Sequence, residues 1–285
     1  MTASVAHRPI TFCAALQVGI EQGCFAAEGL EVVPKPRLAS SALFAVASHG
    51  CNFGFGGVPA VVAGRANGLH LRVVARAAGW PRDPNLSTLQ VVVRRDSEIT
   101  TPKELEWRRL AIDTFGQLGH ISAMVSARKR GADPARIRFV EMPFADMPAA
   151  LESGQVDAAD MGEPYLSRQL EDGARVVFAN SEGFPAEATQ GVWVTTDEFV
   201  AREPEAVRRF RRAIERSNDL CASQPQEARR SLAASLSVPA ELAPRLRMPH
   251  FGNHLERGVF SQYRDALRGL GLISADVDLD ALFLD

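Results

Sequence analysis

The sequence lacks the features that mark several large classes of protein. Its 285 residues include only four cysteines, with no Cys-x-x-Cys pair and no zinc-type histidine spacing, so we expect neither a disulfide framework nor a metal site. The chain does not open on a basic segment followed by an apolar run and a small-residue cleavage site, so no leader is visible. No stretch approaches the roughly 20 apolar residues that span a bilayer, and we expect no membrane insertion.

Neither sign of charge dominates the chain. There are 32 basic and 34 acidic residues, which give a formal net charge of −2. The densest basic run, within residues 208–216, alternates with apolar residues at helical spacing and is typical of a solvated helix face. We therefore expect no nucleic-acid partner.

The common catalytic and cofactor motifs are also missing. GxSxG, HExxH, P-loop and dinucleotide-binding patterns do not occur, and we expect no cofactor. His250 and His254 stand four residues apart, which is a weak metal pattern by itself, and we predict no metal site there. With 46% hydrophobic and 23% charged residues, the composition is that of an ordinary globular protein.

Short strands and helices alternate over the first 180 residues, which predicts α/β units with parallel or mixed sheets. A turn cluster at residues 81–86 separates two blocks of this kind, and the chain from residue 204 onward is predicted to be nearly all helical. The expected strands cover residues 10–14, 30–33, 51–55, 69–75, 89–93, 109–112, 137–141, 156–161 and 176–179, and the helices between them 41–47, 58–63, 118–129 and 147–153.

Two stretches carry a resemblance to a known family. Residues 16–32 read LQVGIEQGCFAAEGLEV, where a helix ends near a Gly-aromatic pair and an E-G-L-x-V turn leads into the next strand. Residues 139–159 read FVEMPFADMPAALESGQVDAA. With ITTPKEL at 99–105 and Glu163-Pro164 following, the span from about 10 to 208 resembles the NMT1/THI5-like and SsuA-like solute-binding proteins of sulfonate, taurine, nitrate and thiamine-precursor uptake.

The resemblance implies a type II periplasmic-binding-protein fold, with two α/β lobes, a ligand cleft and a helical C-terminal segment. We expect residues 1–93 and 194–285 to form lobe 1 and residues 94–193 to form lobe 2. The implied function is that of a non-catalytic solute-binding protein of an ABC-type importer, partnered by the permease. It would clamp a small organic ligand that is aromatic, heterocyclic or of the sulfonate/nitrate class. Its location would be periplasmic or cell-surface if a leader is removed, and cytoplasmic if the sequence is complete as written.

Candidate ligand-contacting residues lie in the loops that follow the predicted strands. In open α/β sheets ligands bind outside the carboxyl ends of the strands, where helix N-termini present unpaired N–H donors. The candidates in these loops, together with two tryptophans that could stack on a planar ligand, are Cys13, Gln17, Ser40, Ser41, Gly56, Gly57, Trp80, Thr114, Phe115, Gly116, His120, Glu163 and Trp193.

Several of these residues have a second interpretation. The hydroxyls of Ser40 and Ser41 could cap a helix instead of binding ligand. Gly56-Gly57 could let the backbone approach a ligand or form a tight turn. Trp80 and Trp193, like Phe184, could stack on a planar ligand or belong to the core.

The charge preference of the site is open at this stage. A carboxylate at Glu163 would repel an anion and favour a cation or an N–H donor, unless it caps the helix that begins at Pro164. In the sulfonate binders a G-S-S-x-H-like segment occupies residues 114–120. Gln117 and Leu118 replace its serines here, which argues against a sulfonate.

An enzyme on the same fold is the main alternative. Cys13 falls where a related aromatic sulfinate desulfinase carries its cysteine, and Phe55-Gly56-Gly57 resembles that enzyme's R-F-G-G. Gly54 replaces the arginine of this pattern, and Phe44 stands near the position of the expected histidine. A buried, inert cysteine is the other interpretation of Cys13. The cysteine-rich motif of THI5-type pyrimidine synthases is absent.

Overall fold

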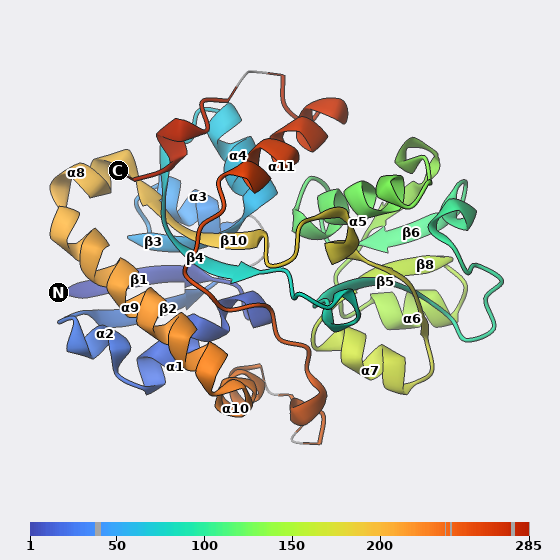
Figure 1. The fold of residues 1–285 in the computed structure, drawn as a ribbon, viewed down its shortest axis with the longest axis horizontal. Coiled ribbons are helices and arrows are strands. Elements are labelled where there is room, and N and C mark those ends of the chain that lie inside the picture. The colour runs from blue at the N-terminus through green and yellow to red at the C-terminus, as the bar shows by residue number, and fades with distance from the viewer. Residues whose placement is uncertain (38–40, 237, 240, 275–276, 285) are drawn as a thin grey trace. The chain divides into compact units, whose positions relative to one another are not determined.

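The computed structural model describes residues 1–37, 41–236, 238–239, 241–274 and 277–284. The chain divides into two compact units, each with its own five-stranded sheet (Figure 1). Unit 1 comprises Met1–Gly79, Ala188–Pro244 and Pro249–Asp285, and unit 2 comprises Trp80–Glu187 and Arg245–Met248. The prediction of two α/β lobes is thereby confirmed.

Unit 1 contains a mixed sheet in the order β2-β1-β3-β10-β4. Strand β1 runs parallel to β2 and β3, whereas β10 is antiparallel to β3 and β4. The strands are β1 (Thr2–His7), β2 (Glu31–Pro36), β3 (Phe53–Gly57), β4 (Leu71–Gly79) and β10 (Thr189–Thr196). The helices are α1 (Ala14–Glu21), α2 (Cys24–Ala27), α3 (Ser41–Ala47), α4 (Val58–Ala66), α8 (Asp197–Arg202), α9 (Pro204–Ser223), α10 (Pro225–Ser235) and α11 (Gly258–Gly269).

The predicted strand at Ile10–Ala14 is wrong. Residues Thr11–Cys13 form a 3-10 turn that leads directly into α1, and the first strand lies upstream at Thr2–His7. Pro9 separates the two, because a proline has no N–H to donate to a sheet. A short apolar run cannot be assigned to strand or helix by its periodicity alone, and here the turn buries Phe12.

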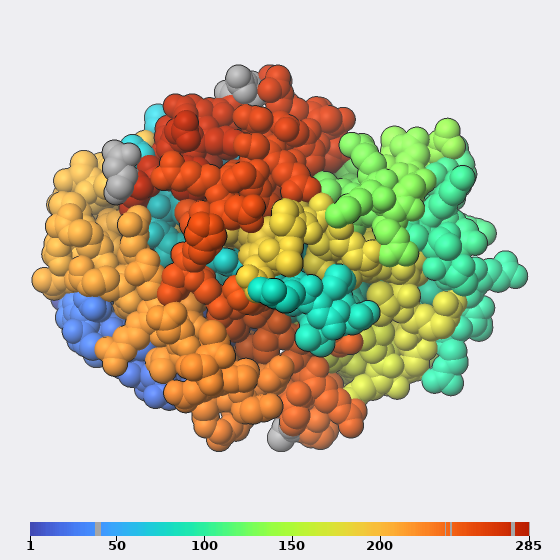
Figure 2. Space-filling view, in the orientation of Figure 1, coloured from blue at the N-terminus to red at the C-terminus, as the bar shows by residue number. Residues whose placement is uncertain are grey.

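The core of unit 1 forms around the long helix α9. The Phe210 ring stacks on Phe53 of β3 with centroids 3.9 Å apart, and Val207 and Ile214 on the same helix face are buried. This 3.6-residue spacing confirms the predicted amphipathic helix. Figure 2 shows the C-terminal residues, coloured orange to red, spread over the visible face of unit 1. Among the described residues, no helix combines the length and the apolar character that crossing a bilayer requires.

Unit 2 contains a sheet in the order β7-β6-β8-β5-β9. Strand β6 runs parallel to β7 and β8, whereas β5 is antiparallel to β8 and β9. The strands are β5 (Leu89–Val93), β6 (Arg109–Ile112), β7 (Arg138–Glu141), β8 (Ala158–Gly162) and β9 (Arg175–Ala179), and the helices are α5 (Leu118–Lys129), α6 (Met147–Glu152) and α7 (Tyr165–Glu171).

Two strands near the unit boundaries belong to a different sheet from the one that the predicted lobe boundaries imply. Leu89–Val93, which that division assigns to lobe 1, is hydrogen-bonded inside the sheet of unit 2. Strand β10 begins at Thr189, inside the range assigned to lobe 2, and pairs in the sheet of unit 1. Both strands are set by contacts distant in sequence, which local patterns do not encode.

A short segment from the C-terminal part of the chain completes unit 2. Residues Arg245–Met248 belong to it although they follow its main body by more than 50 residues. The main-chain N–H of Arg247 donates to Glu163 Oε1 at 3.2 Å, and Ser167 Oγ donates to the Arg245 carbonyl at 3.2 Å. We call residues 245–248 the strap.

Candidate functional site

The parallel strands of each unit indicate at which edge of its sheet a ligand would bind. In unit 1 the carboxyl ends of β1, β2 and β3 lie at one edge of the sheet, and in unit 2 those of β6, β7 and β8 do. Loops at such edges precede helix N-termini and are the usual ligand-binding positions of open α/β sheets. Ligand contacts are therefore expected at that edge of each unit.

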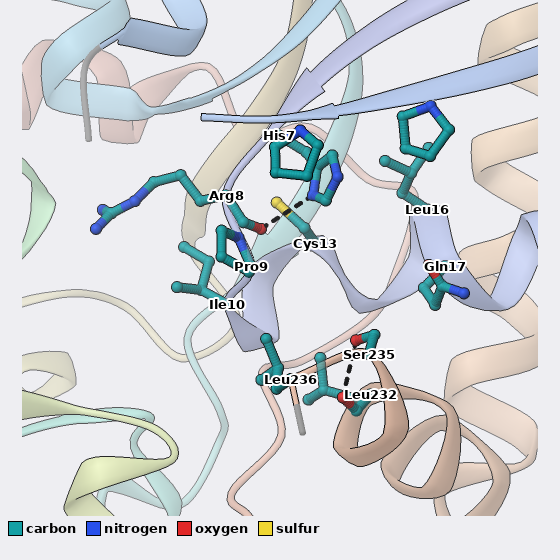
Figure 3. Close-up of a pocket in the computed structure, with 12 residues that line it drawn as sticks. His7, Arg8, Pro9, Ile10, Cys13, Leu16, Gln17, Leu232, Ser235 and Leu236 are labelled. Carbon is teal, nitrogen blue, oxygen red and sulfur yellow. Dashed lines mark hydrogen bonds between the residues drawn. The ribbon is translucent and has the colours of Figure 1, made fainter. Parts of the chain in front are cut away.

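Unit 1 has a pocket of about 330 Å³ at this edge (Figure 3). It lies beyond the ends of β1 and β2, beside the first turns of α1, and the last turn of α10 closes it. This volume is at the small end of the range for organic ligands. The polar lining comprises His7, Arg8, Cys13, Gln17 and Ser235, and the apolar lining includes Ile10, Leu16, Leu232 and Leu236. The structure thus places Cys13, at the end of a 3-10 turn, and Gln17, in α1, in the lining of the same pocket.

Apart from Arg8, the polar groups of the pocket are neutral, and some of them are engaged within the protein. Gln17 Nε2 donates to Glu21 at 2.7 Å, and Ser235 Oγ donates to the Leu232 carbonyl at 2.8 Å. His7 Nδ1 lies 3.2 Å from the Arg8 carbonyl oxygen, and burial lowers the pKa of this imidazole. The pocket therefore favours a ligand with an apolar body and a few hydrogen-bonding groups.

Cys13 lies in this pocket as a protonated thiol. Its side chain is 5% exposed, and burial raises the pKa of the thiol to about 12, with the Arg8 main chain acting weakly in the opposite direction. A thiol attacks only as the thiolate. Cys13 is therefore a poor nucleophile at neutral pH.

We predict that native Cys13 resists alkylation. At pH 8 a thiol with a pKa near 12 is ionised to about one part in ten thousand, so iodoacetamide should label it at least about 100-fold more slowly than free cysteine. Peptide mapping by mass spectrometry of native and urea-unfolded protein measures the rate. Cys221, whose pKa burial also raises to about 12, serves as the internal comparison. Native labelling of Cys13 at the rate of free cysteine would contradict the prediction.

The other candidates of unit 1 divide between loop and core. Ser41 begins α3, and Ser40 lies outside the described residues. Gly56 and Gly57 end β3, where a Cβ on Gly56 would come within 2.6 Å of a Val61 methyl carbon. Packing against α4 thus explains Gly56 without a ligand.

Trp193 belongs to the core of unit 1. It is fully buried in β10 and meets the rings of Phe55 and Phe210 edge-on at 5.9 and 6.1 Å. A strand covered on both faces offers no open surface for stacking. We therefore assign Trp193 to packing rather than to ligand contact.

Three loop candidates of unit 2 lie between β6 and α5. Thr114, Phe115 and Gly116 precede the helix, and Gly116 has a φ of 74°, which favours glycine. Phe115 is 49% exposed, whereas the other aromatic candidate, Trp80, is buried and stacks on Phe184 at 5.6 Å. Of these two aromatic candidates, Phe115 is thus the one whose side chain a ligand can reach.

His120 organises this loop from inside. Its Nδ1 accepts the Gly116 N–H at 3.0 Å, and its ring lies edge-on between Phe115 and Phe139. Burial lowers the pKa of His120 to about 4, so the imidazole is neutral at physiological pH. His120 shapes the loop but adds no positive charge to it.

Glu163 does not present a free charge to a ligand. It is 3% exposed and accepts hydrogen bonds from Ser167 Oγ at 2.8 Å, Ser167 N–H at 3.3 Å and Arg247 N–H at 3.2 Å. The Arg247 guanidinium lies 3.6 Å from the same carboxylate. Burial raises the pKa of Glu163, while Ser167 and Arg247 lower it. The alternative in which Glu163 caps the following helix fits these contacts, and they extend it to holding the strap.

Asp160 is a site residue that the sequence analysis did not select. Its side chain is fully buried in β8, and Asn180 Nδ2 donates to Oδ1 at 2.9 Å. The other oxygen, Oδ2, has no hydrogen-bond partner among the described residues. Burial raises the pKa of Asp160 to about 7; Asn180 lowers it and the charge of Asp113 raises it further. An aspartate within the predicted strand 156–161 was the available signal.

Metal-binding geometry is not found in the described parts of the chain. Within them, no group of three or more His, Cys, Asp or Glu side chains is placed to hold a metal ion.

Comparison with known proteins gives one family and several relatives. The NMT1/THI5-like family profile matches residues 11–228. The taurine-binding periplasmic protein of Escherichia coli (strain K12) is 26% identical over 112 residues, which are 39% of this chain and 35% of that protein. The aligned part is thus about a third of the length of this relative.

Solved structures show the fold over nearly the whole chain. The alkanesulfonate-binding protein SsuA from Xanthomonas axonopodis pv. citri, bound to MOPS, superposes with a TM-score of 0.84 at 17% identity, covering 99% of this chain and 98% of that one. A DSZB cysteine-to-serine mutant in complex with biphenyl-2-sulfinic acid superposes with a TM-score of 0.72 at 16% identity, covering 99% and 96%. The predicted periplasmic-binding-protein fold is confirmed.

Proposed function

Because this chain belongs to the NMT1/THI5-like family, we propose that it is the solute-binding protein of an ABC-type importer and binds a small organic molecule. The relatives that it resembles include a taurine-binding periplasmic protein and alkanesulfonate-binding proteins. The observation that carries the proposal is the pocket of unit 1 at the carboxyl ends of β1 and β2. The permease would be its partner, and the relatives' names support a periplasmic location.

The proposed mechanism needs no covalent step. Ligand binding would stabilise one conformation of the protein, and that conformation is the one that the permease recognises. A ligand shifts such an equilibrium only by the difference between its affinities for the two states. The apolar lining of the unit 1 pocket supports a ligand with an aliphatic, aromatic or heterocyclic part, on which Gln17 and Ser235 select hydrogen-bonding groups.

A sulfinate-cleaving enzyme is the second candidate, because DSZB shares the fold and Cys13 lines the pocket. Such chemistry needs an ionised or activated cysteine. The high pKa of the buried Cys13 thiol and the low pKa of His7 favour two neutral groups instead. We therefore favour binding without catalysis.

Mass spectrometry of retained small molecules tests the function. The purified protein is incubated with a broad metabolite mixture, desalted and analysed, in parallel with Cys13→Ala, Ser235→Trp and Ser223→Trp. We expect wild type and Cys13→Ala to retain the same unaltered compound. A tryptophan at Ser235 should fill the pocket and lower retention about tenfold or more, while Ser223, at the end of α9, is the matched control outside the pocket lining.

Two outcomes contradict the proposal. Retention of no compound argues against a binding function. Depletion of a compound by wild type but not by Cys13→Ala identifies an enzyme.

A further inference from the structure

Two main-chain N–H groups in the loop between β6 and α5, which could otherwise donate to an anionic ligand, are hydrogen-bonded to side chains of the protein. The Phe115 N–H donates to Glu141 Oε2 at 2.8 Å, and the Gly116 N–H donates to His120 Nδ1 at 3.0 Å. Main-chain N–H groups before a helix are the usual anion-binding donors of this architecture. In this chain, the acceptors of those two groups are the protein's own side chains.

The first turn of α5 is likewise occupied by a carboxyl group. A Cβ placed on Gly119 would lie 2.6 Å from Asp160 Oδ2, so this oxygen sits directly against the start of the helix. A helix N-terminus carries a partial positive charge that attracts anions. Here the fully buried carboxyl group of Asp160, from β8, lies at the start of α5. An anionic ligand at this helix N-terminus would therefore face a carboxyl group.

Three acidic residues lie on or directly after the adjacent parallel strands β6, β7 and β8. Asp113 directly follows β6, Glu141 is the last residue of β7, and Asp160 lies in β8. Glu141 is registered opposite Ile112, the last residue of β6. Asp113 is close enough to Asp160 for its charge to raise the Asp160 pKa. The edge therefore presents acceptors and negative charge.

Two further observations indicate what such an edge would bind. Asp160 Oδ2 is buried against the start of α5 and lacks a donor within the described part of the chain, so it lies behind the loop as a carboxyl oxygen that no protein donor satisfies. Phe115, half-exposed in the same loop, offers an aromatic face, and aromatic faces beside carboxylates bind organic ammonium groups. The neutral His120 supplies no competing cation.

We propose that unit 2 recognises a protonated amine or heterocyclic ammonium group of the ligand, with Phe115, Asp113 and Glu141 as contacts and Asp160 behind them. This inference rests on the proposed binding function and narrows its ligand class to amine-bearing molecules. A ligand with an anionic group at its other end is compatible, because the inference concerns only the group that unit 2 contacts. Simple anions without an amine are excluded.

Matched compounds test the inference. Taurine and ethanesulfonate differ by the ammonium group, as do benzylamine and benzyl alcohol, and all four are included in the metabolite mixture offered to the protein. We expect the retained compound to carry an amine, and within each pair the amine to be retained in preference to its analogue. The retained compound is then titrated calorimetrically against the variants.

The variants separate recognition from general damage to the fold. Asp113→Asn and Phe115→Leu should each weaken binding of the amine by about tenfold or more, since a charged hydrogen bond and a cation–π contact are lost. Their controls are Glu152→Gln, an exposed carboxylate on α6, and Trp107→Leu, an aromatic residue 62% exposed elsewhere on unit 2. A purely structural effect would weaken amine and amine-free compounds equally, which would overturn the inference.

The experiment distinguishes failure of this inference from failure of the proposed binding function. Retention of an amine-free compound, or equal binding of taurine and ethanesulfonate, overturns this inference and leaves the binding function intact. Retention of nothing contradicts both.

Discussion

Replacing Asp160 by asparagine should remove a large pH dependence from the stability of the protein. Burial raises the pKa of this carboxyl to about 7, from an ordinary value of 3.8. Between these values the folded protein keeps a proton that the unfolded chain has lost, so stability falls as the pH rises through this window. Above pH 7 the full cost of about 4 kcal/mol, at 1.36 kcal/mol per pH unit, is present.

The measurement is urea denaturation followed by circular dichroism between pH 4.5 and 8.5. The free energy of unfolding of Asp160→Asn, taken relative to that of wild type, should increase as the pH rises. The new buried amide adds a constant difference, which is measured at low pH. Asp157→Asn is the control. Partial burial raises the pKa of Asp157, but hydrogen bonds and the charge of Arg109 lower it on balance. Its stabilisation is lost only as the pH falls below about 4, so its offset should stay constant. Parallel pH curves for wild type and Asp160→Asn would disprove the prediction.

Glu163→Ala should destabilise unit 2 and release the strap. The change removes the acceptor of Arg247 N–H, Ser167 N–H and Ser167 Oγ, and it leaves a guanidinium without its carboxylate. Since the Arg247 side chain keeps 22% exposure, we expect a loss of about 2–4 kcal/mol rather than the larger cost of a fully buried orphan charge.

Limited trypsin digestion reports the release directly, because trypsin cleaves after Arg245 and Arg247. Cleavage at these sites should accelerate about tenfold or more in Glu163→Ala, if opening of the strap alone is eased by 1.4 kcal/mol or more. Glu163→Gln keeps an oxygen acceptor for Arg247 N–H but loses the charge that faces the guanidinium, so it should lie between wild type and Glu163→Ala. If the alanine variant is as stable and as resistant as wild type, the Glu163 side chain does not hold the strap.

Local patterns predicted the elements of unit 2 better than their pairing. The strand at 109–112, the helix at 118–129 and the strand at 89–93 have the predicted bounds, because apolar periodicity and the turn residues flanking them agree. The sheet to which residues 89–93 belong depends on hydrogen bonds to β8 and β9, and no local signal encodes that choice. The strand at Thr2–His7 was missed because its small and polar residues give a weak apolar pattern.

The candidate sites were predictable where their residues are close together in the sequence. Cys13 and Gln17 line one pocket, and residues 114–117 form one loop before α5, because only a few residues separate the members of each group. The α10 wall of that pocket follows more than 200 residues later, and its sequence shows only an amphipathic helix. Whether Asp160 points toward α5 or away from it depends on strand register, which the sequence leaves open.

The strap also has a consequence for synthesis on the ribosome. The main body of unit 2 ends at Glu187, so its sheet can form long before residues 245–248 have left the ribosomal tunnel. At bacterial or eukaryotic elongation rates, the 60 residues between Glu187 and Arg247 take about 3–12 s to add. During that interval Glu163 lacks the Arg247 N–H and Ser167 lacks the Arg245 carbonyl, although Glu163 and Ser167 can already bond each other. The nascent unit therefore passes through a stage in which the strap does not yet cover these two polar side chains, and this difference distinguishes it from the finished protein.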